Sequence, residues 1–92
     1  MVPVQSILPD ALASIIRQAP LTPEKIEFAW RTAVGPSVGR VTTVALDGGV
    51  LRVHAPNEAW RREVERSAAL IRRRIESLLG PGVVRGFDVR ID

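Results

Sequence analysis

The chain has 92 residues, 46% of them hydrophobic and only four aromatic, which limits it to one small domain with a largely aliphatic core. Thirteen basic residues against ten acidic residues give a formal net charge of +3, which favours an anionic partner. The absence of cysteine excludes disulfides, thiolate zinc sites and cysteine nucleophiles, and no apolar run is long enough to cross a membrane.

The N-terminal segment predicts a short helix. It lacks the basic start and apolar run of a signal peptide, so a soluble cytoplasmic protein is expected. Apolar residues at helical spacing indicate a helix from about Ser6 to Ala19, and one face consists of Leu8, Leu12, Ile15 and Ile16. Proline directly after this segment should end the helix.

A second helix is predicted from Pro23 to Val34. Thr22 is a favourable N-cap, and proline suits the first helical position because its missing N–H would have no partner there. Gly35 followed by Pro36 should end the helix. The residues expected to face the core are Ile26, Ala29, Trp30, Ala33 and Val34.

A β-hairpin follows, because the hydrophobic period changes to two. Strands are predicted over Val41–Leu46 and Val50–Ala55, around a tight turn at Asp47–Gly49. Alternation assigns the two faces: Val44, Leu46, Leu51, Val53 and Ala55 should point inward, and Arg52 and His54 outward.

The strongest signal is one long, unbroken helix over residues 57–79. Asn57 is a good N-cap, Glu58 suits the positive end of the helix dipole, and Gly80 stops the helix. Its apolar stripe, about 80° wide, is typical of a helix lying on a core. The stripe consists of Trp60, Val64, Ala68, Ile71, Ile75 and Leu78.

A third strand is predicted over Val83–Ile91, where the inward-facing Phe87, Val89 and Ile91 alternate with Asp88 and Arg90. The order is therefore helix, helix, strand, strand, long helix, strand. This order predicts an α+β two-layer sandwich, with a three-stranded sheet covered by helices on one face. The last strand follows a helical crossover, so it can lie parallel to a hairpin strand, whereas the strand order stays open.

The sequence offers little for catalysis. His54 is the only histidine, and no motif of a serine hydrolase, zinc protease or nucleotide-binding loop occurs. No enzyme activity, cofactor, metal site, small-molecule substrate or membrane partner is therefore expected. Both tryptophans lie on apolar stripes, so burial is favoured over stacking on bases, and Trp60→Ala should cost about 3–5 kcal/mol. The predicted core comprises Trp30, Val34, Leu51, Val53, Trp60, Ile71, Ile75 and Phe87.

The charge excess is local, because six arginines and two glutamates lie between positions 61 and 74. Arg62, Arg66 and Arg73 fall on one line opposite the apolar stripe, with no acidic residue between them on that line. These three arginines, with Arg52 on a strand, are the candidate nucleic-acid-binding residues. The arginines expected nearer the core boundary are Arg61, Arg72 and Arg74.

The alternative for the same surface is a solvated helix face. Ion pairs four residues apart, such as Glu58 with Arg62 and Arg72 with Glu76, would then hold the side chains in place. Such pairs contribute only a few tenths of a kcal/mol each.

Four short motifs, in this order, resemble a known family: Trp30-Arg31-Thr32-Ala33-Val34-Gly35, Gly49-Val50-Leu51-Arg52-Val53, Asn57-Glu58-Ala59-Trp60 and Leu79-Gly80. Over roughly residues 20–91 the chain is similar to the DciA family, bacterial proteins implicated in loading the replicative DNA helicase. The resemblance implies a non-enzymatic adaptor in DNA replication. Its implied partners are the replicative helicase and DNA, the latter contacted without sequence preference.

The resemblance also implies a fold similar to a type II KH domain. It would form a single domain over residues 1–92, with residues 1–20 as an N-terminal helix and 21–92 as the family-like core. KH domains grip backbone phosphates with a Gly-x-x-Gly loop between two helices. Here one helix is predicted instead, and the nearest pattern, Gly35–Gly39, has a different spacing and place. A pure protein-interaction module and an RNA-binding KH-like domain stay open as alternatives.

Overall fold

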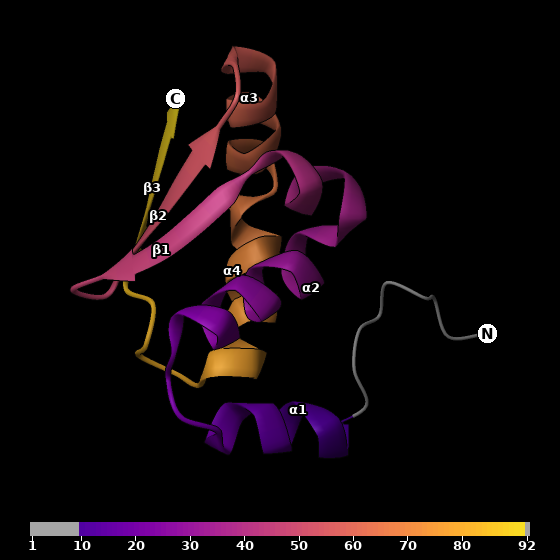
Figure 1. Ribbon diagram of the computed structural model, residues 1–92, viewed down its shortest axis with the longest axis vertical. Coiled ribbons are helices and arrows are strands. Elements are labelled where there is room, and N and C mark those ends of the chain that lie inside the picture. Colours follow the sequence, from indigo (N-terminus) through magenta and orange to yellow (C-terminus); the bar gives the residue numbers. More distant parts are fainter. Residues whose placement is uncertain (1–9, 92) are drawn as a thin grey trace.

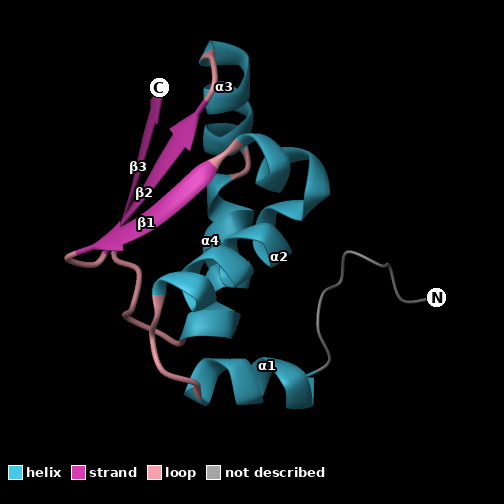
Figure 2. Ribbon diagram, viewed as in Figure 1, coloured by secondary structure: helices cyan, strands magenta, loops and turns pink. Residues whose placement is uncertain are grey.

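The computed structural model describes residues 10–91 as helices gathered on one side of a three-stranded sheet (Figure 1). Figure 2 shows the two layers, which confirm the predicted α+β sandwich, whereas its likeness to a type II KH domain stays a prediction. No helix in residues 10–91 is both long and apolar enough to span a membrane. The elements are α1 (Asp10–Gln18), α2 (Pro23–Val41), β1 (Thr43–Asp47), β2 (Val50–Ala55), α3 (Glu58–Arg66), α4 (Ala68–Leu79) and β3 (Gly86–Ile91).

The sheet has the order β1-β2-β3, which the sequence left open. β1 pairs antiparallel with β2, and β3 pairs parallel with β2, so the predicted hairpin and the predicted parallel strand are both confirmed. Gly48 and Gly49 have φ angles of 58° and 84°, as a two-residue hairpin turn of the I′ type requires. The Arg85 guanidinium covers this turn and donates to the Gly48 carbonyl at 2.9 Å.

The start of α2 follows its sequence signals. The Thr22 Oγ1 accepts a hydrogen bond from the Lys25 N–H at 3.2 Å, and Pro23 occupies the first turn, which confirms the predicted cap. Gly35 leaves the helical region with φ 87° and ψ 172°, so the predicted break is present. A backbone with this positive φ strains any residue with a Cβ.

The predicted end of α2 is wrong, because the helix resumes after Gly35 and continues to Val41. The first strand accordingly starts at Thr43 rather than at Val41. Pro36 is the physical reason: directly after the break it lies in the first turn of the resumed segment, where its missing N–H costs no hydrogen bond. A glycine–proline pair can thus end one helical segment and begin the next.

The prediction of one unbroken long helix is also wrong. The helix divides at Ser67, whose φ of −98° and ψ of 7° lie outside the helical region, into α3 and α4. The two parts have different packing partners: α3 contacts β2 and β3, whereas α4 contacts α1 and α2. Serine competes for backbone hydrogen bonds and so permits a bend that lets each part follow its own neighbour.

α1 is only partly covered by the prediction. It begins at Asp10, and residues 6–9 of the predicted helix lie outside the described residues. Ala13 is buried and Ile16 packs against the core, but Leu12 and Ile15 are exposed, contrary to the expected apolar face. The helix packs on α4, where the Arg17 NH1 donates to the Ser77 carbonyl at 2.7 Å.

β3 begins at Gly86, three residues later than the predicted Val83. The backbone N–H groups of Arg85 and Gly86 both donate to the Gly49 carbonyl, at 2.7 and 3.3 Å, and so bring the chain to the sheet at the hairpin turn. Val83 and its neighbour pack against the core from the preceding loop instead. Of the expected inward residues, Phe87 and Val89 pack against the core and Ile91 is exposed.

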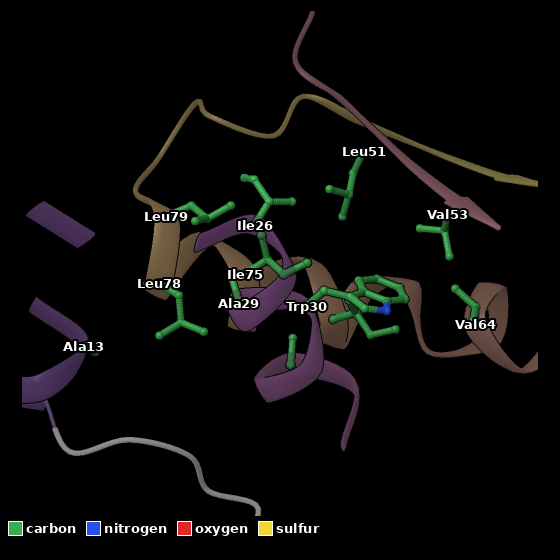
Figure 3. Close-up of a cluster of buried hydrophobic side chains, with 12 residues drawn as sticks. Ala13, Ile26, Ala29, Trp30, Leu51, Val53, Val64, Ile75, Leu78 and Leu79 are labelled. Atoms are coloured by element: carbon green, nitrogen blue, oxygen red, sulfur yellow. The ribbon is translucent and has the colours of Figure 1, made fainter. Parts of the chain in front are cut away.

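The core lies between the sheet and the helices (Figure 3). Trp30 is its largest fully buried side chain, and its Nε1 donates to the Thr42 Oγ1 at 2.8 Å. A buried indole N–H needs such an acceptor. Phe87 packs at a tilt against Trp30, with ring centroids 6.3 Å apart. Of the predicted core residues, Trp30, Leu51, Val53, Ile71 and Ile75 are buried, and Val34 and Phe87 are partly buried and pack against the cluster.

Trp60 is the exception among the predicted core residues. It is half-buried and lies outside the core cluster, where it lines an apolar surface hollow of about 430 Å³ with Val38, Ala59 and others. Val38, which also lines this hollow, belongs to the resumed segment of α2 that the sequence did not predict.

Candidate nucleic-acid interface

The arginine-rich surface is set by the start of α3. The Asn57 Oδ1 accepts a hydrogen bond from the Trp60 backbone N–H at 3.0 Å, which confirms the predicted N-cap. Glu58 occupies the first turn, where the positive end of the helix dipole favours a carboxylate. α3 follows β2 after a connection of two residues, the second of which is the cap, so the arginines of α3 have a fixed position relative to the sheet.

Arg61 is held by two carboxylates on its own helix. Its Nε donates to Glu58 at 2.8 Å and its NH1 lies 2.7 Å from Glu65. The Arg61 hydrogen bonds lower the pKa of Glu58 from 4.5 to about 2, and this pairing raises the pKa of Arg61. Because its side chain is only 27% exposed, Arg61 contributes to the structure of α3 rather than to an open binding surface, as expected for a boundary residue.

Arg62 and Arg66 are the most open arginines of α3, with side chains 69% and 72% exposed. Arg62 lies 3.2 Å from Glu58 and Arg66 lies 3.2 Å from Glu63. The prediction of a line free of acidic residues therefore needs correction, because both guanidinium groups have a glutamate one turn away. The Glu58–Arg62 pair of the alternative interpretation is present. Such exposed pairs contribute little to stability, so an incoming phosphate can displace the glutamate at low cost.

The arginines of α4 divide into two kinds. Arg72 donates to the Arg85 carbonyl at 2.7 Å, and Arg74 donates to the Ala33 carbonyl at 2.9 Å, so both brace neighbouring segments. The expected pair of Arg72 with Glu76 is absent from residues 10–91. Arg73 is exposed and makes no hydrogen bond or ion pair to any residue in the described range. It is the α4 side chain most open to an external anion.

Arg52 lies on a different surface. Its neighbours Leu51 and Val53 are buried toward the helices, so strand alternation turns Arg52 to the opposite face of the sheet. There it lies 3.3 Å from Asp47. Thus the structure places Arg62, Arg66 and Arg73 on the helical layer, whereas Arg52 is separated from them by the sheet.

A comparison with known protein families identifies the family of this chain. Residues 3–89 match the family described as "Dna[CI] antecedent, DciA". The chain belongs to the DciA family. Membership supports a role in helicase loading during DNA replication, and DciA is not a known enzyme family. No curated protein matches the chain.

The junction of α3 and α4 in this DciA chain differs from the phosphate-binding loop of a KH domain. A KH domain clamps backbone nucleotides with a Gly-x-x-Gly loop between two helices. Here the junction is a single residue, Ser67, between Arg66 and Ala68, and it contains no glycine. Contact with a nucleic acid at this junction would therefore use side-chain cations rather than a glycine loop.

A further cation of this DciA chain lies on α2, whereas the sequence associated it with the strands. Arg40 is exposed in the last turn of α2 and, like Arg73, makes no hydrogen bond or ion pair within residues 10–91. Proline after Gly35 is the signal that could have placed it on a helix. The same range contains no group of three or more His, Asp or Glu residues that could hold a metal ion.

Proposed function

We propose that this member of the DciA family is a non-enzymatic adaptor that helps to load or operate the replicative DNA helicase. We further propose that Arg62, Arg66 and Arg73 attach it to DNA through phosphate contacts that do not depend on sequence. One observation carries the DNA contact. Three exposed guanidinium groups lie along α3 and α4, two in exchangeable surface pairs and one without a hydrogen-bond or ion-pair partner among the described residues.

Phosphate binding suits this arrangement because a guanidinium group donates two parallel hydrogen bonds to phosphate oxygens. Replacing a solvated glutamate by a phosphate exchanges one surface ion pair for another, so the folded chain loses little. Phosphate contacts carry no direct sequence information, which suits an adaptor that acts wherever the helicase is loaded. Arg52, on the opposite face of the sheet, would form a separate contact.

Salt dependence tests the assignment. Fluorescence anisotropy of labelled duplex DNA and labelled oligo(dT) is measured against salt for the full chain and for Arg62→Ala/Arg66→Ala/Arg73→Ala. If each arginine neutralises one phosphate, the triple variant loses a log–log slope of about 2.7 on duplex or about 2.1 on single strands. An unchanged slope would exclude these arginines as the contact.

A matched control removes the same charge from other surfaces. Arg31, Arg40 and Arg90 are exposed and lie outside α3 and α4. The variant Arg31→Ala/Arg40→Ala/Arg90→Ala should keep the wild-type salt slope, because these arginines lie outside the proposed interface and neutralise no phosphate. A general attraction of DNA to the net positive charge would instead lower the slope in both triple variants. Equal losses in the two triple variants would contradict a localised site. Arg52→Ala, measured alone, shows whether the outer sheet face adds a further contact.

A pull-down tests the adaptor role itself. The purified replicative helicase should be retained by the full chain, and the triple variant on α3 and α4 shows whether retention requires these arginines. Retention that survives nuclease treatment, with no anisotropy change on DNA at low salt, favours the pure protein-interaction module. Tighter binding of oligo(rU) than of oligo(dT) favours the RNA-binding alternative. Failure to retain the helicase under all conditions would contradict the adaptor proposal.

A further inference from the structure

β1 presents an open edge of the sheet. It pairs with β2 on one side, and in the described part of the chain its other side has no neighbouring strand. Protein sheets commonly protect such an edge with lysine, proline or a bulge. The segment Thr43–Asp47 carries none of these protections, and Asp47 at its end is its only charged residue.

The hairpin turn determines which backbone groups face outward. Because a two-residue turn makes Asp47 and Val50 a hydrogen-bonded pair, alternate residues of β1 direct their N–H and C=O groups away from β2. These residues are Val44 and Leu46. No backbone hydrogen bond outside the β1–β2 ladder involves β1 within residues 10–91. Val44 and Leu46 therefore offer their backbone N–H donors and C=O acceptors to an added strand.

An apolar hollow of about 240 Å³ lies beside one end of this edge. It is formed by the start of α2 and by β1, with Leu21 and Ile26 on one side and Val44 and Leu46 on the other. Leu21 is 53% exposed although it lies in this apolar environment. The hollow is smaller than a typical site for a drug-sized ligand, so it suits one apolar side chain.

A basic hollow of about 260 Å³ lies beside the other end of β1, and Val44 lines both hollows. Arg31, Arg40 and Glu27 contribute its charged side chains. Arg31 lies 3.0 Å from Glu27, which leaves the Arg40 charge without a partner in the described range. The edge thus has an apolar pocket at one end and a net positive pocket at the other.

We propose that β1 receives an extended segment of a partner protein as a fourth strand. In this segment an apolar side chain and a carboxylate, two positions apart, face α2. Side chains two apart lie on the same face of a strand, so one enters the hollow at Leu21 and the other reaches Arg40. Main-chain hydrogen bonds to Val44 and Leu46 provide affinity, and the two hollows provide specificity. This surface is distinct from the arginines proposed to contact DNA.

The probes are acetylated and amidated peptides of about eight residues, the length of a typical strand. They carry Leu-x-Glu or Glu-x-Leu, because the added strand can run in either direction. In NMR titrations of the full chain, the Val44 and Leu46 amide signals should shift and their hydrogen exchange should slow. Leu→Ala or Glu→Gln in the peptide should weaken binding. N-methylation of one alternating set of peptide amides should abolish binding, while N-methylation of the other set should not.

The two unpartnered arginines supply a matched pair of protein variants. Arg40→Glu should weaken peptide binding by about tenfold or more, because it reverses the charge facing the carboxylate. Arg73→Glu, the same charge change on α4, should leave peptide binding unchanged. Both side chains are exposed and neither makes a hydrogen bond or ion pair within residues 10–91, so both variants should fold.

Several outcomes overturn the proposal. Equal weakening by Arg40→Glu and Arg73→Glu, or equal effects of the two N-methylated sets, would show charge attraction without strand addition. Binding of neither peptide would also overturn it. A concentration-dependent dimer in sedimentation, with shifts at Val44 and Leu46 in the absence of peptide, would assign the edge to a second copy instead. The peptide test does not depend on the arginines of α3 and α4. Its result therefore stands whether or not variants of those arginines lose DNA binding.

Discussion

The two tryptophans have opposite environments, although each lies on the apolar stripe of its helix. Trp30 is 1% exposed, and its indole N–H donates to a buried threonine. Trp60 is half-buried beside a surface hollow. Its backbone N–H, rather than its indole N–H, donates a hydrogen bond within residues 10–91, to the N-cap residue Asn57. Periodicity therefore indicates which side of a helix is apolar, whereas the neighbouring elements decide whether that side reaches the core.

The largest expected difference is in stability. Trp30→Ala should lower the free energy of unfolding by about 3–5 kcal/mol, because it opens a cavity at the centre of the core. Trp60→Ala should cost at most about 2 kcal/mol, because less apolar surface is lost. Urea denaturation followed by far-UV circular dichroism measures both. Similar losses in the two variants would contradict the contrast between the sites.

Removing the indole's hydrogen-bond acceptor should have the next largest effect. Thr42 is 7% exposed, and its Oγ1 accepts from Trp30 and donates to the Val38 carbonyl at 2.7 Å. Thr42→Val should cost about 1–3 kcal/mol, because it leaves the buried N–H without a partner. Thr42→Ser keeps the hydroxyl and serves as the control in the same denaturation experiment. A Thr42→Val protein as stable as Thr42→Ser would show that water replaces the lost acceptor.

The Trp60 side should respond to its backbone cap. Asn57→Ala removes the acceptor of the Trp60 N–H and should cost about 1 kcal/mol, whereas Asn57→Ser should retain most of the stability. Thermal unfolding compares the three proteins. If Asn57→Ala and Asn57→Ser melt together, the cap does not hold this end of α3.

The smallest effect should appear as a change in acid sensitivity. Glu58 has its pKa lowered from 4.5 to about 2, so its ion pairs with Arg61 and Arg62 stabilise the fold above about pH 4.5. That contribution is lost as the pH falls from 4.5 to 2, since the unfolded chain binds the proton first. Glu58→Gln should therefore flatten the pH dependence of stability in this window. Urea denaturation at a series of pH values measures this slope, and a Glu58→Gln protein with the wild-type slope would contradict the role of Glu58.

Local signals predicted most of the elements, because caps, turns and periodicity act over a few residues. Thr22, Asn57 and the Gly48–Gly49 turn each set a boundary where expected. The missed features depend on contacts distant in sequence. The bend at Ser67 follows from two sets of packing partners, and the late start of β3 follows from hydrogen bonds to Gly49.

For the candidate site, the sequence predicted which arginines lie at the surface better than it predicted the groups they contact. Helical periodicity placed Arg62 and Arg66 at the surface and offered the Glu58–Arg62 pair as an alternative, but it did not indicate the pair of Arg66 with Glu63. It separated Arg73 from Arg72, but it did not indicate the carbonyl to which Arg72 donates, since that carbonyl belongs to a loop thirteen residues away. Whether a surface arginine is available to a ligand depends on carbonyl groups that only the folded chain brings near it.

The parallel pairing of β2 with β3 has a consequence for how the chain folds. β1 and β2 meet across a two-residue turn, whereas β3 reaches β2 only after α3 and α4 have been crossed. Closing that long loop costs entropy before its contacts form, so the hairpin should appear early and β3 should dock late. Until then the central strand has one side open to other chains. Dilute refolding should therefore give a higher yield of monomer than concentrated refolding.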